Sequence, residues 1–313
     1  MHNLTVEEKK EIYGSFLSAN YWWIILSIFI GIFSHYSRAI RWKLMLEPMG
    51  YNPSLKNTFM AVMIGYLANL ALPRLGEVSR CGILARYEKI PMNKSFGTVV
   101  IERGIDVISL FLALFINFIL HLDKLSLFKQ SKLFIKVSEQ YNQLENPGIV
   151  YWVGIGIVVL FIFIFIKTRH LISDLKIYKS FKVLILGFIE GIKSLTKLKK
   201  PYLFIFHSIN IWVMYLLMAY VVFFSIPETS HLSLDVGLAV LVFGSIGIII
   251  VQGGIGIYPW IIAETLLIFG ITQTKGYAMG WLLWTGQTVM IITFGLLSMG
   301  LLPLLNRKRH ESS

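Results

Sequence analysis

Three charged residues follow a break in an apolar stretch of the chain. The apolar run ends at Pro73, and Arg74, Glu77 and Arg80 come directly after it. Proline interrupts a helix because it cannot donate a backbone hydrogen bond, and Gly76 lets the backbone turn or approach a ligand closely. A helix that starts after this turn presents free N–H groups and the positive end of its dipole, which attract anions. The pattern predicts an anion site at the turn, where the arginines add positive charge and Glu77 holds them apart or pairs with one.

A second group, Glu102, Arg103 and Asp106, lies near the start of a later apolar segment. Glu102 and Asp106 are four residues apart, so they share one face of a helix. A charge at the centre of a bilayer costs about 2.5–3.5 kcal/mol, so charges at that depth must pair, line a wet cavity or lie near the interface. We therefore expect this group to lie within reach of Arg74 or Arg80. Two interpretations stay open, namely an ion-pair cluster that only pins helices together and a polar path for a substrate.

A glycine-rich run joins two apolar segments in the second half of the chain. It consists of Gln252, Gly253, Gly254 and Gly256, with Ile255 between the last two glycines. Helix packing through small residues is the plain interpretation of such a run. Gln252 and the nearby Glu264 favour a binding role, because polar side chains between apolar segments often mark a transport site.

Composition restricts the chain to one class of protein. Of its 313 residues 56% are hydrophobic and only 15% are charged, and the mean hydropathy is +0.68. Soluble domains carry about 25% charged residues. The net charge of +12 does not indicate nucleic acid, because the basic residues lie in short loops beside apolar segments, where they set topology and meet anionic headgroups. Cys81 is the single cysteine, so no disulfide can form within the chain.

The apolar runs predict an all-α, polytopic membrane protein with about five full spans and two broken or re-entrant helix pairs, in about seven to eight apolar segments. The predicted spans are residues 21–46, 95–122, 148–167, 201–225 and 276–304. The predicted pairs are 55–72 with 77–89, and 234–251 with 255–271. Interrupted apolar segments in both halves of a chain point to a transport site between repeats, although the halves share no sequence identity.

Charge in the loops sets the predicted domains and their orientation. Residues 1–20 form a polar to amphipathic surface segment, 21–305 a single transmembrane domain, and 306–313 a basic cytoplasmic tail. Within the domain, residues 167–200 read as a basic amphipathic helix on the inner surface. Loops rich in Lys and Arg face the cytoplasm, which puts 226–233, with no Lys or Arg, outside. Residues 121–147, whose charges are mixed, are also predicted outside, with little help from charge. On this basis Arg38 and Arg41 are interpreted as topology signals and headgroup contacts.

The sequence offers no motif for a bound metal or cofactor. The seven histidines are scattered, with no pair at metal-ligand spacing. The chain has neither a phosphate-binding loop with its lysine nor a Gly-x-Gly-x-x-Gly fingerprint. We therefore expect no metal and no nucleotide cofactor.

Several blocks of residues resemble the lysylphosphatidylglycerol synthase transmembrane-region family over about residues 15–305. They are Asn69, Leu72 to Arg80, Glu102 to Asp106, Gly253 to Gly256, and Arg38 with Arg41-Trp42. The resemblance implies a flippase-like membrane module, with site residues in these blocks. The chain departs from the family in lacking the soluble synthase domain, in beginning after the family's first helix, and in having residues 249–252 where the family has prolines.

The best hypothesis is a multi-pass lipid translocase of the cell membrane. It would bind a phospholipid or lipid-linked headgroup through Arg74, Arg80 and the helix start after Gly76, with Glu77 and the 102–106 group balancing the charge. A transferase that acts inside the membrane on a lipid-linked substrate is an alternative, and so is a non-catalytic partner of a lipid-modifying enzyme. The sequence favours a transporter over an enzyme, and it leaves open the lipid, the direction, the energy source and an oligomer.

Overall fold

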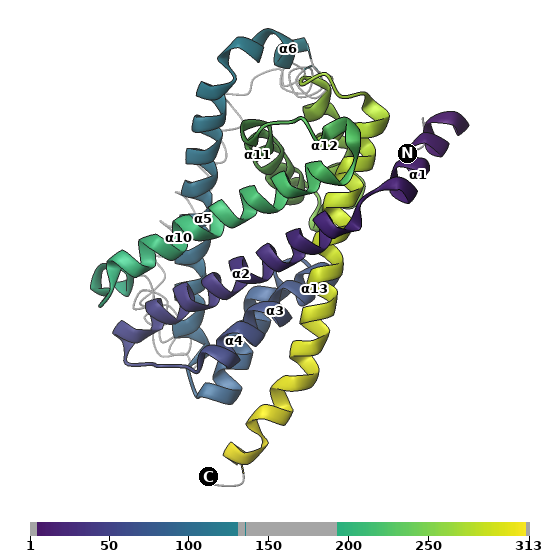
Figure 1. The fold of residues 1–313 in the computed structure, drawn as a ribbon. Coiled ribbons are helices and arrows are strands. Elements are labelled where there is room, and N and C mark those ends of the chain that lie inside the picture. The colour runs from purple at the N-terminus through teal and green to yellow at the C-terminus, as the bar shows by residue number, and fades with distance from the viewer. Residues whose placement is uncertain (1–4, 131–134, 136–192, 311–313) are drawn as a thin grey trace, which may run out of the picture.

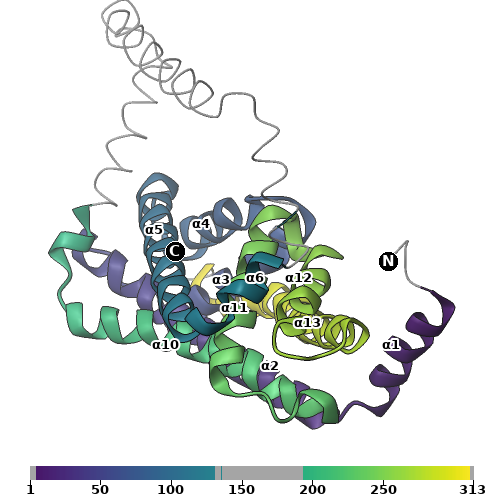
Figure 2. The same cartoon turned by 90° about the horizontal axis from the view of Figure 1, so that it is seen from above.

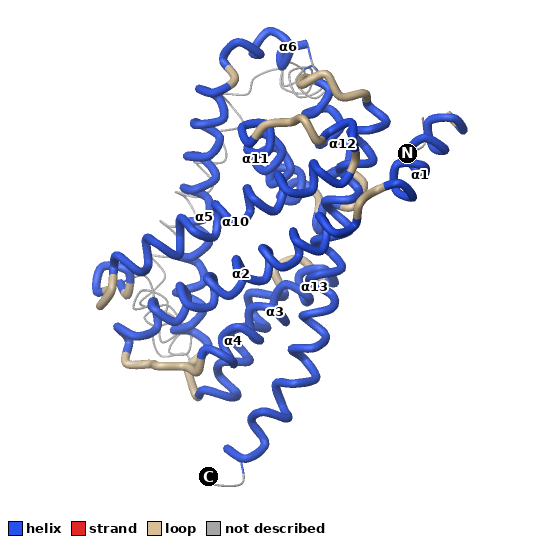
Figure 3. Tube along the Cα trace, viewed as in Figure 1, coloured by secondary structure: helices blue, strands red, loops and turns tan. Residues whose placement is uncertain are grey.

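The structure is a computed structural model that describes residues 5–130, 135 and 193–310. Within these ranges the chain is helical, with short connecting loops and no β-strand (Figure 3). The predicted all-α fold is therefore confirmed. The predicted span 148–167, most of the segment 167–200 and most of the loop 121–147 lie outside the described residues.

The described elements agree with the predicted segments to within a few residues (Figure 1). The α-helices are α1 (Val6–Ser18), α2 (Tyr21–Leu46), α3 (Leu55–Ala71), α4 (Leu75–Glu88), α5 (Met92–Leu120), α6 (Leu125–Gln130), α10 (Pro201–Val222), α11 (Leu234–Ile250), α12 (Ile257–Leu267) and α13 (Gln273–His310). The 3-10 turns are η1 (Glu47–Met49), η2 (Leu122–Lys124), η3 (Leu195–Lys197), η4 (Phe223–Ser225), η5 (Pro227–Thr229) and η6 (Gln252–Gly254).

The polar N-terminal segment forms helix α1 beside the first turns of α13. Thr5 caps α1 in a reciprocal capping box with Glu8, which satisfies two backbone donors that the helix start leaves free. The Lys275 ammonium of α13 donates to the Ser15 hydroxyl at 3.1 Å. Viewed from above, α1 stands at the edge of the bundle (Figure 2). The location of residues 1–20 at a membrane surface stays a prediction.

Helices α2 and α10 lie side by side and run in opposite directions (Figure 1). At one end the Asn20 backbone N–H donates to the Ser225 carbonyl at 2.7 Å. Further along, the Asn210 side-chain amide donates to the Ser37 hydroxyl at 2.7 Å. Polar groups buried in apolar surroundings need such partners. The pair forms one wall against which α5 and the remaining helices pack.

Helices α3 and α4 form the first helix hairpin, with Pro73 at its tip. Its two open ends meet, because the Asn57 side-chain amide at the start of α3 donates to a Glu88 carboxylate oxygen at the end of α4, at 2.6 Å. The same amide donates to Asn306 at 2.9 Å, which fixes this end beside the last turns of α13. The hairpin therefore enters and returns at one end of the molecule, as the re-entrant prediction requires.

Helices α11 and α12 form the second hairpin, and η6 is its tip. The two helices approach closely because Gly244 and Gly247 of α11 face Tyr258 and Ile261 of α12. The open end lies at the start of α13, where the Gln273 side-chain amide donates to Glu264 at 3.0 Å. The second hairpin is thus anchored at the opposite end of α13 from the first.

Helix α13 packs against both hairpins, contacting α3 of the first and α12 of the second (Figure 1). Near its middle the Trp284 indole N–H donates to the Gly253 carbonyl at the second tip, at 2.6 Å. Gly295 lies against the Leu67 side chain of α3, and η6 itself contacts α3. The two hairpins therefore enter from opposite ends, and their inner parts meet at the middle of the molecule.

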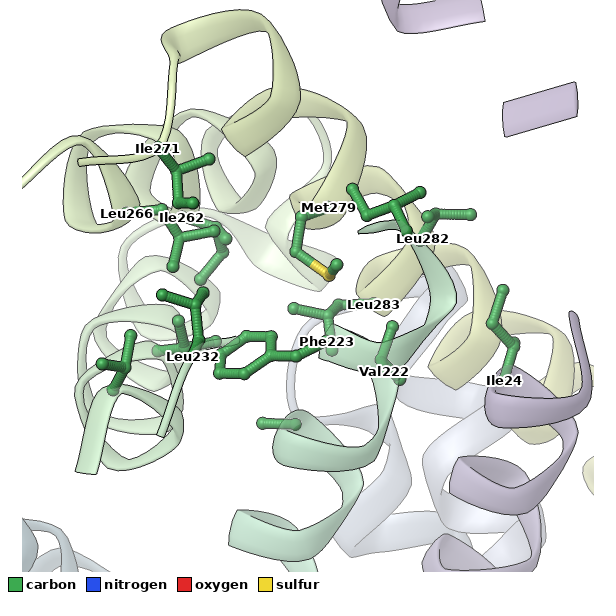
Figure 4. Packing of buried hydrophobic residues seen from close by; sticks show 14 of the residues in the cluster. Ile24, Val222, Phe223, Leu232, Ile262, Leu266, Ile271, Met279, Leu282 and Leu283 are labelled. Atoms are coloured by element: carbon green, nitrogen blue, oxygen red, sulfur yellow. The ribbon is translucent and has the colours of Figure 1, made fainter. Parts of the chain in front are cut away.

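Two apolar cores occupy the two ends of the bundle. One, seen in Figure 4, joins α2, α10, α11, α12 and α13 around Phe223, Ile262, Leu266 and Met279. The other surrounds Trp42 and joins α2, α3, α4, α5 and the start of α10. Between the two cores lies the polar region described below.

Three of the described helices are long and apolar enough to cross a membrane, namely those spanning Tyr21–Met49, Pro201–Ser225 and Gln273–Arg307. Helix α5 has 29 residues, or about 44 Å at 1.5 Å per residue, and it carries the charged 102–106 group. The hairpin helices are shorter, with 11 to 17 residues each. The chain is therefore a helical membrane protein with several apolar helices.

Candidate functional site

A cluster of five charged side chains joins α2, α4 and α5. At its centre one nitrogen of Arg38, Nη1, lies 2.6 Å from Glu102 Oε1 and 2.7 Å from Asp106 Oδ2. On the other side, Arg41 Nη2 lies 2.8 Å from Asp106 Oδ1. The Arg80 Nη1 of α4 lies 3.2 Å from Glu102 Oε2. We call Arg38, Arg41, Arg80, Glu102 and Asp106 the arginine–carboxylate cluster.

The arginine–carboxylate cluster is almost completely buried. The side chains of Arg41 and Glu102 have no exposed surface, and that of Asp106 is 15% exposed. Arg80 also stacks over the Trp42 ring, with its guanidinium carbon 4.7 Å from the ring centroid. Burial of charge is tolerated only with such pairing and hydrogen bonding. The cluster therefore fixes the relative positions of α2, α4 and α5.

Arg103 forms a separate ion pair, the Glu77–Arg103 pair, beside this cluster. Its Nη2 lies 2.7 Å from Glu77 Oε1. The Arg103 side chain is 43% exposed, whereas that of Glu77 is 17% exposed. Glu77 Oε2 is buried and has no hydrogen-bond partner among the described residues. This pair joins α4 to α5 with a single contact and leaves donor and acceptor capacity unused.

A cavity of about 340 Å³ lies beside the charged groups, among α2, α3, α5 and the helices of the second half. Its polar part is lined by Arg38, Tyr66, Arg103, Asp106 and Tyr215. Its apolar part is lined by Leu110, Met218, Leu241, Ile248 and Leu283. The cavity is thus amphipathic, with charge at one side and hydrocarbon at the other.

Two lining residues show that the cavity reaches the outer surface of the bundle. Val107 of α5 is 50% exposed and Ile249 of α11 is 69% exposed, and both line the cavity. In a membrane protein such apolar exposed positions face lipid. The cavity therefore extends to exposed residues of α5 and α11 at the surface of the bundle.

Gly76 determines how the first hairpin closes. A side chain at Gly76 would collide with the Gly65 carbonyl and the Asn69 side chain, so only glycine allows α3 and α4 to approach here. The Gly76 N–H donates to Asn69 Oδ1 at 2.7 Å, and the Leu75 N–H donates to the Leu72 carbonyl at 3.3 Å. The prediction of free N–H groups at this helix start is therefore wrong for both positions, because groups within the hairpin occupy them.

Arg74 lies apart from the other predicted site residues. It is exposed at the hairpin tip and has a left-handed backbone with φ 63°. It does not line the cavity, and no ion pair joins it to the described residues. Of the 102–106 group, Glu102 alone pairs with Arg80, whereas Asp106 pairs with Arg38 and Arg41 and no member pairs with Arg74. Glu77, for its part, pairs with Arg103 and with neither arginine of its own turn.

The glycine run forms the tip of the second hairpin. Gly253, Gly254 and Gly256 have φ of 69°, 68° and 76°, a left-handed region that favours glycine. The run thus makes a turn and is more than a small-residue packing face. The side chain of Gln252 lies outside the described part, and the glycines do not line the cavity.

The interpretation of Arg38 and Arg41 as topology signals and headgroup contacts is wrong. Both are buried and complete the arginine–carboxylate cluster, because α5 brings two carboxylates to the same depth. An arginine three residues after another inside an apolar span was the available signal, since each needs a counter-charge there. Tyr66 and Tyr215, which line the cavity, gave no comparable signal in the sequence. Among the described residues, no group of His, Cys, Asp and Glu could hold a metal ion.

A helical membrane domain with two opposed broken hairpins around a charged cavity is the class that the fold and the site define. The chain belongs to the family described as the lysylphosphatidylglycerol synthase TM region, whose model matches residues 7–295. It is 34% identical over 104 residues to UPF0104 membrane protein MJ1595 of Methanocaldococcus jannaschii. That match covers 32% of this chain and about a third, 31%, of the relative. No solved structure matches the chain.

Proposed function

We propose that this protein translocates a lipid with a phosphate headgroup between the two leaflets of the cell membrane. The observation that carries the proposal is the amphipathic cavity, which has charged residues on one side and apolar residues on the other. Its volume of about 340 Å³ suits a headgroup better than a whole lipid, because acyl chains can stay in the bilayer. The family name, which refers to a phospholipid-modifying enzyme's membrane region, supports a lipid substrate.

Arg103 is the residue we propose as the main headgroup contact. The guanidinium groups of Arg38, Arg41 and Arg80 are already engaged by buried carboxylates. Arg103 lines the cavity and is 43% exposed. A planar guanidinium can hold two phosphate oxygens at once, which a lysine cannot.

The arginine contacts of Glu102 and Asp106 argue against the transferase alternative. A general base must be able to accept a proton from its substrate, and Glu102 is enclosed by three arginines. Asp106 contacts two arginines with its two oxygens. Both acids are therefore better suited to holding the helices than to proton abstraction.

Headgroup flipping in proteoliposomes tests the proposal. The full chain would be reconstituted with fluorescent phosphatidylglycerol, and an impermeant quencher would report the fraction of lipid in the outer leaflet. We expect Arg103→Gln to slow flipping at least about tenfold, the equivalent of 1.4 kcal/mol of headgroup interaction, with little change in thermal unfolding. Mass spectrometry of the same vesicles should find no new lipid species.

Arg74→Ala is the matched control, because it removes an arginine from the hairpin tip outside the cavity. We expect it to flip lipid at the rate of the unmodified protein. If Arg74→Ala abolished flipping and Arg103→Gln did not, the headgroup would bind at the turn, as the sequence predicted. An unmodified protein that folds but moves no lipid would contradict the translocase proposal.

A further inference from the structure

The Arg103 guanidinium lies between two sites. Arg103 lines the large cavity and also a small pocket beside Asn69 and Arg80, and its Nη2 lies 2.7 Å from Glu77 Oε1. An anion that enters the large cavity therefore meets the same guanidinium that neutralises Glu77. The two negative groups compete for one cation.

Glu77 differs from Glu102 in how much it depends on a single partner. Glu102 keeps three arginines within 4 Å, whereas Glu77 has one ion pair and one oxygen without a hydrogen-bond partner among the described residues. The charged and titratable groups that act on Glu77 or on its partner are Arg103, Arg38 and Glu102 across the interface, Arg80 and Cys81 on α4, and Tyr66 on α3. Of these, Arg103 alone makes an ion pair with Glu77.

We propose that binding of a monoanionic lipid phosphate at Arg103 is coupled to uptake of one proton by Glu77. This inference rests on the translocase function proposed above. When the phosphate takes the guanidinium, or shares it at close range, the ionised form of the enclosed Glu77 carboxylate loses its stabilisation. A proton from water then forms an O–H bond on Glu77, and no electron is transferred.

The charge balance of the region sets what one loading step carries. Four arginines, Arg38, Arg41, Arg80 and Arg103, face three carboxylates, so the region carries one excess positive charge. Arrival of one anion and one proton leaves that excess unchanged, so the coupled step is electroneutral. The proton also offers a source of energy, since a pH gradient would act on the loaded site.

Calorimetry with dihexanoyl-phosphatidylglycerol as the probe counts the protons directly. The detergent-solubilised full chain would be titrated between pH 5.5 and 8 in pairs of buffers with different ionisation enthalpies. We expect uptake of close to one proton per lipid bound at the acidic end of this range, where Glu77 is ionised in the free protein and protonated in the complex, and less uptake as pH rises. Binding should tighten as pH falls, by at most about tenfold per pH unit, because one proton is linked to each lipid. Dihexanoyl-phosphatidylglycerol does not itself titrate in this range.

Glu77→Gln removes the proton acceptor and keeps the size of the side chain. We expect it to bind the probe with no proton uptake and an affinity independent of pH, whereas Glu77→Asp should retain the proton. Glu88→Gln is the matched control on the same helix, because Glu88 holds the open end of the hairpin away from the cavity. It should behave as the unmodified protein.

The outcomes separate this inference from the proposed function. If the unmodified protein binds and flips lipid without taking up a proton, the coupling is wrong and the translocase proposal stands. If Glu77→Gln still takes up a proton, another group accepts it and the assignment to Glu77 is wrong. If the unmodified protein neither binds nor flips the lipid, both proposals fail.

Discussion

Glu102 and Glu77, two acidic residues of the same region, differ in burial and in the number of their arginine partners. Glu102 has no exposed surface and lies in a cluster with Arg38, Arg41 and Arg80. Glu77 is 17% exposed and pairs with Arg103, which is itself 43% exposed. The shortest contacts are of similar length, 2.6 Å and 2.7 Å. The difference teaches that burial and the number of partners, rather than distance, separate a fixed contact from an exchangeable one.

The arginine–carboxylate cluster is a structural element because its members cannot be removed one at a time. A buried charge that loses its partner costs far more than the pair contributes. The Glu77–Arg103 pair can separate at lower cost, because Arg103 reaches the cavity and any water or headgroup in it. We therefore assign stability to the cluster and substrate exchange to the pair, and each prediction below tests that division.

The largest effect should follow the loss of Glu102. We expect Glu102→Leu to destabilise the protein by about 3–5 kcal/mol, because it strands the buried Arg80 and leaves Arg38 and Arg41 with Asp106 alone. Glu77→Leu should cost no more than about 1 kcal/mol, since the partner it strands is partly exposed. Thermal unfolding in detergent, followed by circular dichroism, measures both. Equal losses would show that the cluster and the pair are not distinct in stability.

A double-mutant comparison should give the next largest effect. In Arg103→Met/Glu77→Leu both members of the pair are gone and no charge is stranded, so the free energy of unfolding should stay within about 1 kcal/mol of the unmodified protein. Arg41→Met/Asp106→Leu should remain unstable, because Arg38 loses one of its two carboxylates. Melting temperatures of the singles and doubles complete both cycles. Recovery of stability in the Arg41/Asp106 double mutant would contradict the proposed role of the cluster.

Much of the fold was predictable because it follows from hydropathy and helix breakers. The span 21–46 coincides with α2, and the two interrupted segments became the two hairpins, because Pro73 and the Gly253–Gly256 run end helices by backbone chemistry alone. Entry of the two hairpins from opposite sides follows from the loop charges, which put both ends of 55–89 inside and 226–233 outside. The contacts that hold them at the two ends of α13, such as Asn57 with Asn306 and Gln273 with Glu264, could not be predicted.

The candidate site was predictable in its members but not in its pairs. The energetic cost of buried charge correctly required partners for Glu102 and Asp106. The choice of partner depends on how α2, α4 and α5 pack, and several arginines and carboxylates allow many combinations. Arg38 and Arg41 were therefore misread as topology signals. Arg74 follows the proline break, where the sequence predicted an anion site. Because α3 and α4 approach closely at Gly76, Arg74 lies instead at the exposed tip of the hairpin.

The rate of reaction with a thiol reagent should distinguish the Glu77–Arg103 pair from the arginine–carboxylate cluster. We expect this effect to be smaller than the changes in stability. On a Cys81→Ser background, we expect Arg103→Cys to react with a small water-soluble thiol reagent, because this position lines the cavity. Ser208→Cys, buried beside Arg41 at 3.4 Å, should react at least about tenfold more slowly, in line with local opening being required. Mass spectrometry of the labelled chain gives the rates.

Ser230→Cys serves as the reference for orientation in the same experiment. The loop that holds it contains no Lys or Arg, so by the positive-inside rule it faces outward. It should react from the outside of intact cells or right-side-out vesicles. Labelling from the cytoplasmic side alone would reverse the predicted topology and, with it, the side from which Arg103 is reached.

The smallest effect should come from an exposed ion pair of the same length as the Glu77–Arg103 pair. Lys275 Nζ lies 2.7 Å from Glu228 Oε1, and Glu228 is 44% exposed. The hydrogen bond from Lys275 lowers the pKa of Glu228 below its ordinary value of 4.5. The stabilisation is therefore fully present above about pH 4.5 and is lost as pH falls through the lowered pKa of the folded protein.

Because solvent screens this pair, Glu228→Gln should change the free energy of unfolding by at most about 0.5 kcal/mol at pH 7. That difference should shrink as pH falls through the lowered pKa of Glu228, and it should also shrink in 1 M salt. Thermal unfolding in detergent at pH 3 and 7 measures it. A loss as large as that of Glu102→Leu would show that distance alone sets the strength of these pairs, which would remove the distinction between cluster and pair.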